Sequence, residues 1–331
     1  MSNFYRHAKE LFIAEKSFGT KEYILLGLKL ITAASIIFYF ARKISFSDVM
    51  RVLTTADIYF LALAGLLSFV NLLFQFFKWR IISKKCLGVD STKKLTLSLM
   101  HGIAAASFTP ARLGECVGRK LALPESTLLQ VTIATFVDKL FALFVTVGIG
   151  AATAILYLHF VQNVSIYITV SLFVVFAACL VFDAYLITHQ SLWNSFLIRQ
   201  LKEIKFLRGV AHKFSLLKNL DSKTLWYSML LNFAFYSCYL LQYAILIRAF
   251  APGAKFIDSL WSGSLMFFAK TIIPAISIGD LGVREGASMY FSKQFGISEL
   301  AGLNAALAIF LINIALPAFV GMLLLFKKPN D

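Results

Sequence analysis

The sequence predicts an all-α polytopic membrane protein with about six transmembrane helices and two re-entrant broken-helix hairpins related as an inverted repeat. Three observations predict this class. Hydrophobic residues make up 59% of the 331 residues and charged residues only 15%, which is far from the composition of a soluble domain. Six apolar stretches reach the length of about 20 residues that a helix needs to cross a bilayer. Two further apolar stretches are interrupted by proline and glycine, which break helices.

The predicted spans follow one another within a single integral membrane domain, residues 1–331. They cover residues 22–41, 57–79, 127–156, 165–187, 224–249 and 299–326. A first repeat half runs over about 22–156 and a second over about 165–326. Within the second half, residues 190–223 combine apolar and basic residues near helical spacing. This segment fits either a basic loop that fixes the topology or a helix that lies on the membrane surface and gathers anionic lipid.

The two interrupted stretches, residues 95–123 and 257–293, are the predicted hairpins. The residues that break their helices are Pro110 and Gly114 in the first hairpin, and Pro274, Gly279 and Gly282 in the second. Irregular backbone at membrane depth is tolerated only where protein or a water-filled cavity satisfies its polar groups. We therefore expect both breaks to lie inside the protein.

The positions of lysine and arginine orient the spans, because cytoplasmic segments are enriched in these residues. When residues 1–21 are placed in the cytoplasm, the cytoplasmic segments hold 19 of the 32 basic residues and the external segments hold 6. The sequence thus predicts a multi-pass protein of the cytoplasmic membrane with both termini inside. Three spans separate the hairpins, so they enter from opposite faces. Since the basic residues gather on no soluble face, nucleic acid is not an expected partner.

Both hairpins carry the same charge motif. "PARLGECVGR" and "PAISIGDLGVR" each read Pro-Ala, a short spacer, Gly, an acid, and Arg four residues after the acid. The acid and the arginine are Glu115 and Arg119 in the first copy, and Asp280 and Arg284 in the second. Secondary transporters built from inverted repeats place their substrate site where the broken helices meet. Helix N-termini at such a site favour anions such as phosphate.

Charged residues at membrane depth are the candidate substrate-binding residues, because each costs about 3 kcal/mol there unless it faces a cavity or a partner. They are Arg112, Glu115, Arg119, Asp138, Lys139, Lys270, Asp280, Arg284 and Glu285. The guanidinium groups would bind phosphate, while the carboxylates would balance them, meet a headgroup amine or carry protons. The alternative is that acid and arginine four residues apart neutralise each other and only hold the hairpins in place.

Uncharged polar residues within the spans are expected to form interhelical hydrogen bonds, with a hydrophilic path as the alternative. They are Asn71, Gln75, Asn232, Gln242, Asn304 and Asn313. The glycine pairs Gly114 with Gly118, and Gly282 with Gly286, have a spacing that lets helices approach closely. The histidines and cysteines show no spacing typical of a metal site. We expect no metal and no cofactor.

Three segments, "PARLGE", "TFVDKLFAL" and "SIGDLGVREG", resemble in this order the landmarks of the lysylphosphatidylglycerol synthase transmembrane family, also called flippase-like membrane proteins. The resemblance extends over about residues 20–326. It implies a membrane region that moves a lipid to the outer leaflet, here without the soluble synthase domain of the fused members. By the same resemblance, Asp138 and Lys139 look like the family's acid-base pair.

The sequence therefore predicts a lipid flippase or transporter for a phospholipid or lipid-linked substrate with a phosphate headgroup. Its partners would be membrane lipids. The chain has no GxxxxGK[ST] loop, which argues against direct use of ATP. Two alternatives stay open: a membrane-embedded glycolipid or lipid transferase, and an accessory membrane subunit that partners a lipid-modifying enzyme. An acidic pair with DxD spacing, which would favour the transferase, is not found in the sequence.

Overall fold

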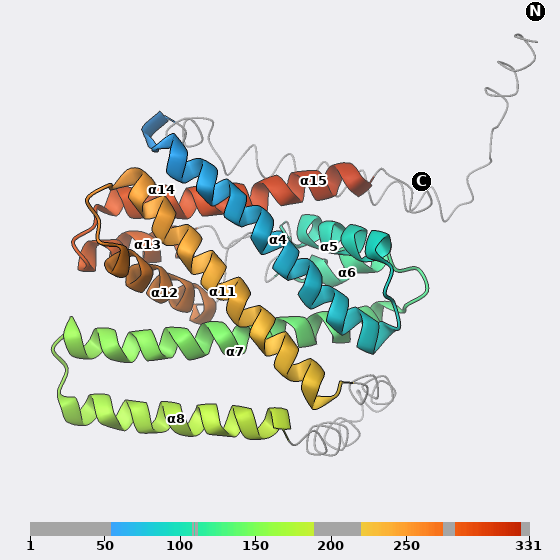
Figure 1. The fold of residues 1–331 in the computed structure, drawn as a ribbon, viewed down its shortest axis with the longest axis horizontal. Helices are drawn as coiled ribbons and strands as arrows, with labels where there is room; N and C mark the ends of the chain where they lie inside the picture. Colours follow the sequence, from blue (N-terminus) through green and yellow to red (C-terminus); the bar gives the residue numbers. More distant parts are fainter. Residues whose placement is uncertain (1–53, 108, 110–111, 189–219, 274–281, 326–331) are drawn as a thin grey trace, which may run out of the picture. The chain divides into compact units, whose positions relative to one another are not determined.

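The computed structural model describes residues 54–107, 109, 112–188, 220–273 and 282–325. They belong to the second of two compact units, Ile44–Asp331. The described residues form helices and no strand, which confirms the predicted class (Figure 1). The helices are α4 (Ile58–Leu87), α5 (Thr92–Ala106), α6 (Gly114–Leu121), α7 (Leu128–Phe160), α8 (Ile166–Thr188), α11 (Ser222–Phe250), α12 (Phe256–Ile272), α13 (Val283–Gln294), α14 (Glu299–Phe310), the π-helix η5 (Leu311–Ala315) and α15 (Leu316–Leu325).

Long apolar helices lie where the sequence predicts spans. Within the described residues, four helices are long and apolar enough to cross a membrane: Ile58–Leu87, Leu128–Phe160, Ser222–Phe250 and Glu299–Leu324. A fifth predicted span corresponds to α8, whose apolar part runs over Ile166–Phe182. The predicted span 22–41, the segment 190–219 and the residues Pro110, Pro274, Gly279 and Asp280 lie outside the described residues.

The first of these helices, α4, continues past the predicted boundary at residue 79 and ends at Leu87. Gly88, at φ 70°, terminates it in a left-handed conformation that glycine adopts without steric cost. Arg80 Nε and Lys84 Nζ donate to the Asp90 carboxylate at 2.7 and 2.6 Å and hold the turn into α5. The predicted end was wrong because the fall in hydropathy marks where the side chains become charged, not where the backbone stops being helical.

Each predicted hairpin forms two helices separated by a break. In the first, α5 and α6 pack so closely that a Cβ on Gly114 would lie 2.5 Å from the Ala105 carbonyl oxygen. In the second, α12 packs against α13, where the hydroxyls of Ser262 and Ser292 lie 3.3 Å apart. The predicted breaks are therefore confirmed, while the depth at which the hairpins enter the bilayer stays a prediction.

The second pair of glycines does not act as the sequence predicts. A Cβ on Gly282 or Gly286 would meet no atom within 4 Å, so no close helix approach depends on either glycine. Gly282 instead has φ 104°, a conformation that side-chain-bearing residues rarely adopt, at the start of α13. The prediction of close packing was wrong for this pair, because the spacing of small residues fixes a helix face but not what lies against it.

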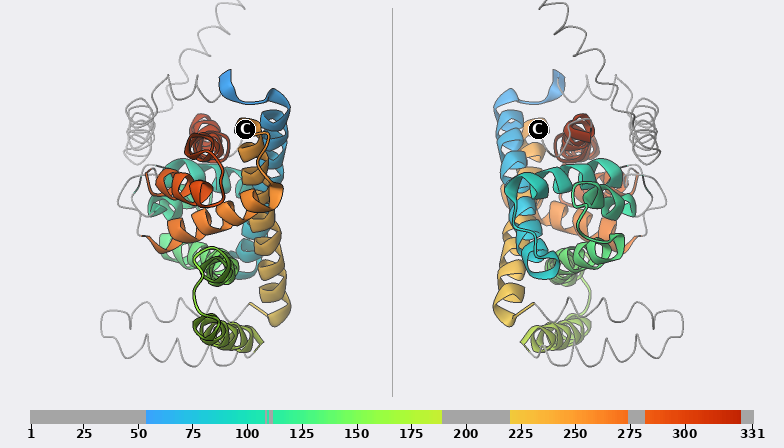
Figure 2. Two further views of the ribbon diagram at one scale, coloured as in Figure 1. Left: turned by 90° about the vertical axis from the view of Figure 1, so that its left-hand side faces the viewer. Right: turned by 90° about the vertical axis from the view of Figure 1, so that its right-hand side faces the viewer.

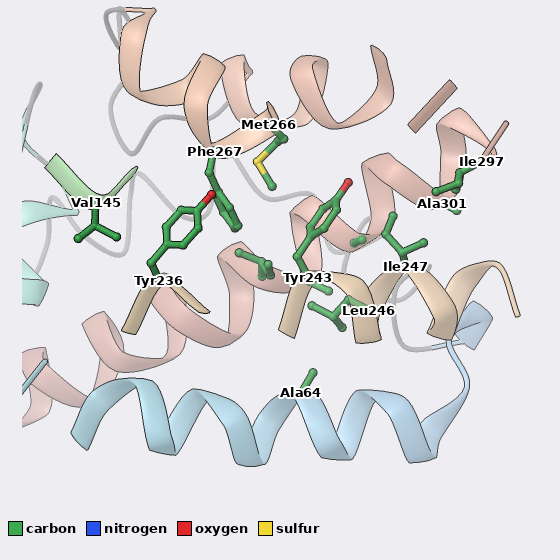
Figure 3. Packing of buried hydrophobic residues seen from close by; sticks show 13 residues of the cluster. Ala64, Val145, Tyr236, Tyr243, Leu246, Ile247, Met266, Phe267, Ile297 and Ala301 are labelled. Carbon is green, nitrogen blue, oxygen red and sulfur yellow. The ribbon is translucent and has the colours of Figure 1, made fainter. Parts of the chain in front are cut away.

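An apolar cluster and the contact between α4 and α11 hold the helices around the breaks. The main apolar cluster lies between α4, α11, α12 and α14, with the Tyr243 ring at its centre (Figure 3). The Tyr243 hydroxyl is 2.7 Å from the Ser288 hydroxyl of α13 and so ties that helix to α11. Helices α4 and α11 run side by side (Figures 1 and 2). Their contact is polar at one point, because Gln242 Oε1 accepts from the amides of Asn71, at 2.9 Å, and Asn313, at 2.7 Å.

That amide network confirms the predicted interhelical hydrogen bonds for three of the six polar residues. Asn313 reaches Gln242 from η5, a single π-helical turn just before Pro317. Such turns shift the register of a helix by one residue and are frequent at functional sites. Asn232 instead donates to its own helix, at the Ser228 carbonyl oxygen.

Candidate functional site

The centre of the candidate site is a set of six charged side chains that three helices bring together. We call it the α6 charge cluster: Lys78 of α4, Arg112 from the turn before α6, Glu115 and Arg119 of α6, and Asp138 and Lys139 of α7. Helix α6 is only eight residues long, and its acid and arginine are one helical turn apart, so both project toward α7.

Glu115 is bound by three cations and is 3% exposed. Its Oε1 accepts from Arg119 at 2.7 Å and from Lys139 at 2.8 Å. Its Oε2 lies 3.6 Å from Arg112 Nε. The predicted ion pair of Glu115 with Arg119 is therefore present. It is one contact of a larger network of charges, so the two residues do not simply neutralise each other.

Arg119 links the two carboxylates of the cluster. Besides Glu115 it contacts Asp138 Oδ2, at 3.1 Å, and Asp138 Oδ1 lies 3.9 Å from Lys78 Nζ. The guanidinium of Arg119 lies over the Trp79 ring, 4.0 Å from its centroid, which is a favourable cation-π geometry. Arg119 is 2% exposed, and its Nη2 makes both contacts with the carboxylates.

The charges of the cluster do not cancel. Four cations face two carboxylates, which leaves a net charge of +2 when all are ionised. Removing charge from water is costly unless it is compensated. An uncompensated positive charge in a protected site therefore favours an anion.

Arg112 has an unusual backbone conformation. Its φ is 58°, in the left-handed region that non-glycine residues seldom occupy. Such strain costs about 1–3 kcal/mol and is retained where the surrounding structure holds it, often at functional sites. The Arg112 side chain is 39% exposed, whereas Glu115 beside it is 3% exposed. Of the three cluster members on α6 and its preceding turn, Arg112 is therefore the one that is partly exposed.

A cavity of about 160 Å³ lies against this arginine. Arg112 and Lys270, at the end of α12, both line it, so residues of both broken-helix units contribute to one site. The other lining residues are the amides Gln75, Asn232 and Asn313, the hydroxyl-bearing Thr146 and Thr271, the aromatic Phe235, Tyr236, Tyr239 and Phe267, and the aliphatic Ile103, Ala142 and Ile314. The volume corresponds to roughly five water molecules in the liquid, enough for a phosphate group and its nearest substituents.

The second charge motif is arranged differently from the first. Arg284 is 1% exposed, donates to Glu285 Oε1 at 2.8 and 3.1 Å, and lies over the Phe310 ring at 5.0 Å. Glu285 Oε2 accepts from the Gly282 backbone N–H at 2.6 Å. Since this carboxylate caps the N-terminus of α13, the helix end already has an anion, and the pair is neutral.

The structure thus brings five of the predicted site residues into the α6 charge cluster and two, Arg112 and Lys270, to the cavity. Arg284 and Glu285 form their own pair on α13, and Asp280 lies outside the described residues. Lys78 was missed: it lies at the end of the predicted span 57–79, two residues before Arg80, and was counted with the cytoplasmic basic residues. A signal was present: Asn71, Gln75 and Lys78 have helical spacing on one face of α4.

Among the described residues, no group of three or more histidine, cysteine, aspartate or glutamate side chains is placed to hold a metal ion. No curated protein and no solved structure matches the chain. One family model matches it, the lysylphosphatidylglycerol synthase TM region, over residues 24–321. That match covers most of the sequence and includes both broken-helix units, the α6 charge cluster and the cavity, and it shows that the chain belongs to the lysylphosphatidylglycerol synthase transmembrane-region family.

Proposed function

We propose that this protein is a lipid flippase or transporter that moves a phosphate-bearing lipid across the cytoplasmic membrane. The observation that carries the proposal is the shared cavity. Arg112 belongs to the positively charged α6 cluster and Lys270 ends α12, and both line the same space of about 160 Å³. Membership of a family of membrane regions associated with lipids supports the same assignment.

In the proposed cycle, the acyl chains stay in the bilayer and only the headgroup enters the cavity. The cavity is too small for a whole lipid but suits a phosphodiester, whose oxygens match the planar guanidinium of Arg112. The rest of the α6 charge cluster fixes this arginine, because Glu115, next to it, is itself bound by Arg119 and Lys139. Movement of one broken-helix unit against the other would open the cavity to each leaflet in turn.

A transport assay tests the proposal directly. Purified protein is reconstituted into liposomes that contain phosphatidylglycerol with a fluorescent group on one acyl chain, and dithionite then bleaches only the label in the outer leaflet. Wild-type protein should make nearly all of the label accessible, whereas empty liposomes should protect about half of it. The variant Arg112→Gln should transport far more slowly, since a charge-assisted hydrogen bond to phosphate contributes about 1.5–3 kcal/mol.

Lys293→Gln is the matched control. It also removes one positive charge from a hairpin helix, but Lys293 is exposed and pairs with Glu299 at 2.7 Å. Its transport rate should equal that of the wild type. Wild-type protein that leaves the protected fraction at the level of empty liposomes would refute transport of phosphatidylglycerol.

A further inference from the structure

The cavity also indicates which class of headgroup it accepts, an inference that rests on the proposed function. An aminoacylated phospholipid carries an ammonium group, so a site that binds its headgroup must compensate that positive charge. A buried ammonium needs a carboxylate or a free aromatic face.

The carboxylates beside the cavity are already engaged. Both oxygens of Glu115 face basic residues, and Asp138 lies between Arg119 and Lys78. On α13, one oxygen of Glu285 binds Arg284 and the other binds the Gly282 N–H. No aspartate or glutamate is among the described lining residues of the cavity. Among the described lining residues, an ammonium group entering the cavity would therefore meet Arg112 and Lys270 and no carboxylate.

The aromatic side chains do not offer an alternative site for a cation. The Phe235 ring already has the Lys78 ammonium over its face, 4.5 Å from the centroid. Tyr236 and Tyr239 pack edge-on against Phe267, with ring planes 67° and 61° apart. These rings form a packed wall, not an open cage around an ammonium-sized space.

The remaining polar groups suit hydroxyls. Asn232 donates its amide N–H to the Ser228 carbonyl oxygen, while its own Oδ1 is buried without a hydrogen-bond donor. Thr146 and Thr271 line the cavity and donate to carbonyl oxygens of their own helices, so their hydroxyls are left with accepting capacity for a ligand. Leaving an acceptor buried without a donor costs about 1–3 kcal/mol, and a hydroxyl of the ligand would supply the missing donor.

We propose that the cavity selects a lipid whose headgroup is anionic overall and carries uncharged hydroxyls next to its phosphate, that is, a glycerol-phosphate or sugar-phosphate headgroup, and that it excludes aminoacylated headgroups. Arg112 binds the phosphate and the acceptor groups of the α11 and α7 wall bind the hydroxyls. Phosphatidylglycerol and a polyprenyl-phosphate-linked hexose share this chemistry.

Native mass spectrometry on purified protein with an equimolar lipid mixture tests the selectivity. The mixture contains phosphatidylglycerol, its lysyl ester, a polyprenyl-phosphate-linked hexose and phosphatidylcholine. Wild-type protein should retain one of the two hydroxyl-bearing anionic lipids about tenfold more than the lysyl ester, the equivalent of one charge-assisted contact. The lipid that is retained identifies the source of the headgroup.

Two variants assign the selectivity to this cavity. Arg112→Gln should lose the enrichment, and Gln75→Glu, which places a carboxylate in the lining, should shift the ratio about tenfold toward the lysyl ester. Lys293→Gln should leave the ratio unchanged. The Gln75 substitution keeps side-chain shape, so it remains informative if the Arg112 variant fails to fold.

The outcomes separate the two proposals. Equal or stronger retention of the lysyl ester by wild-type protein would overturn the headgroup assignment and leave lipid transport standing. An unchanged ratio in Gln75→Glu would show that the headgroup does not enter this cavity. Retention of no class above phosphatidylcholine, together with no transport in liposomes, would overturn the proposed function itself.

Discussion

Replacing Gly118 with alanine adds one methyl group where α5 and α6 leave no room for it. A Cβ at this position would lie 2.7 Å from the His101 carbonyl carbon and 2.8 Å from the Ala105 Cβ, and closer still to the His101 carbonyl oxygen. Carbon atoms prefer separations of about 3.5–4.0 Å. The overlap is therefore about 1 Å, and because two of the three obstacles are backbone atoms, no side-chain rotation relieves it.

The expected destabilisation follows from two opposing effects. Overpacking a closely packed site costs about 1–3 kcal/mol, and the backbone obstacles place this substitution near 3 kcal/mol. Alanine in a helix is favoured over glycine by about 1 kcal/mol. The net loss in the free energy of unfolding is then about 2 kcal/mol. Because Arg119 is the next residue, separation of α5 from α6 would also pull its guanidinium away from Asp138.

Gly286 provides the control for this experiment, since it is the second glycine of the other pair that the sequence predicts to pack closely. A Cβ there meets nothing within 4 Å, so Gly286→Ala should keep only the helical gain of about 1 kcal/mol. Thermal unfolding in detergent, followed by tryptophan fluorescence at one heating rate, compares the variants even if unfolding is irreversible. Gly118→Ala should lower Tm by about 5 °C, and Gly286→Ala should leave it equal or slightly higher. Equal shifts for both variants would refute the argument from packing.

Two further substitutions test the stability of the helices around the site. Gln242→Leu removes the acceptor that the amides of Asn71 and Asn313 share, so both amides lose this hydrogen bond while buried. The free energy of unfolding should fall by about 2–4 kcal/mol. The fall in Tm should be larger than that of Gln242→Glu, which keeps an acceptor. Asp90, whose pKa is lowered by its hydrogen bonds to Lys84 and Arg80, should stabilise the α4–α5 turn above its ordinary pKa of about 4 and lose this effect as pH falls through its lower folded-state value. Asp90→Asn should therefore lower Tm at pH 7, and this difference should shrink as the pH falls below about 4; a difference that stays constant over that range would contradict this assignment.

Much of the helical framework follows from local sequence alone. Apolar runs of sufficient length predict spans, and proline with glycine predicts breaks, because both effects act within one helix. The pairing of Glu115 with Arg119 is predictable for the same reason, since residues four apart face one another on a helix. These predictions need no knowledge of which helices become neighbours.

The position of Lys78 could not be predicted in this way. Its charge is compensated by Asp138, sixty positions later in the sequence, and the 3.9 Å between them depends on how α4 packs against α7. Similarly, the two charge motifs read alike in sequence, yet Arg119 contacts Asp138 of α7 while Arg284 contacts only its neighbour Glu285 among the ion pairs of the described residues. The two arginines therefore differ in their ion pairs because different helices pack against α6 and α13, and not because the motifs differ.

This asymmetry bears on how a lipid could be released in the proposed cycle. Two equivalent, uncompensated cation sites on opposite sides of one phosphate would bind it too tightly for turnover. Here the α13 pair is neutral, so the positive charge is concentrated on the side of α6. Even there, Glu115 Oε2 lies 3.6 Å from Arg112 Nε and competes with the phosphate for the same guanidinium. Since a retained carboxylate weakens binding of the incoming anion, Glu115 would pair with Arg112 again when the headgroup leaves and so favour its release.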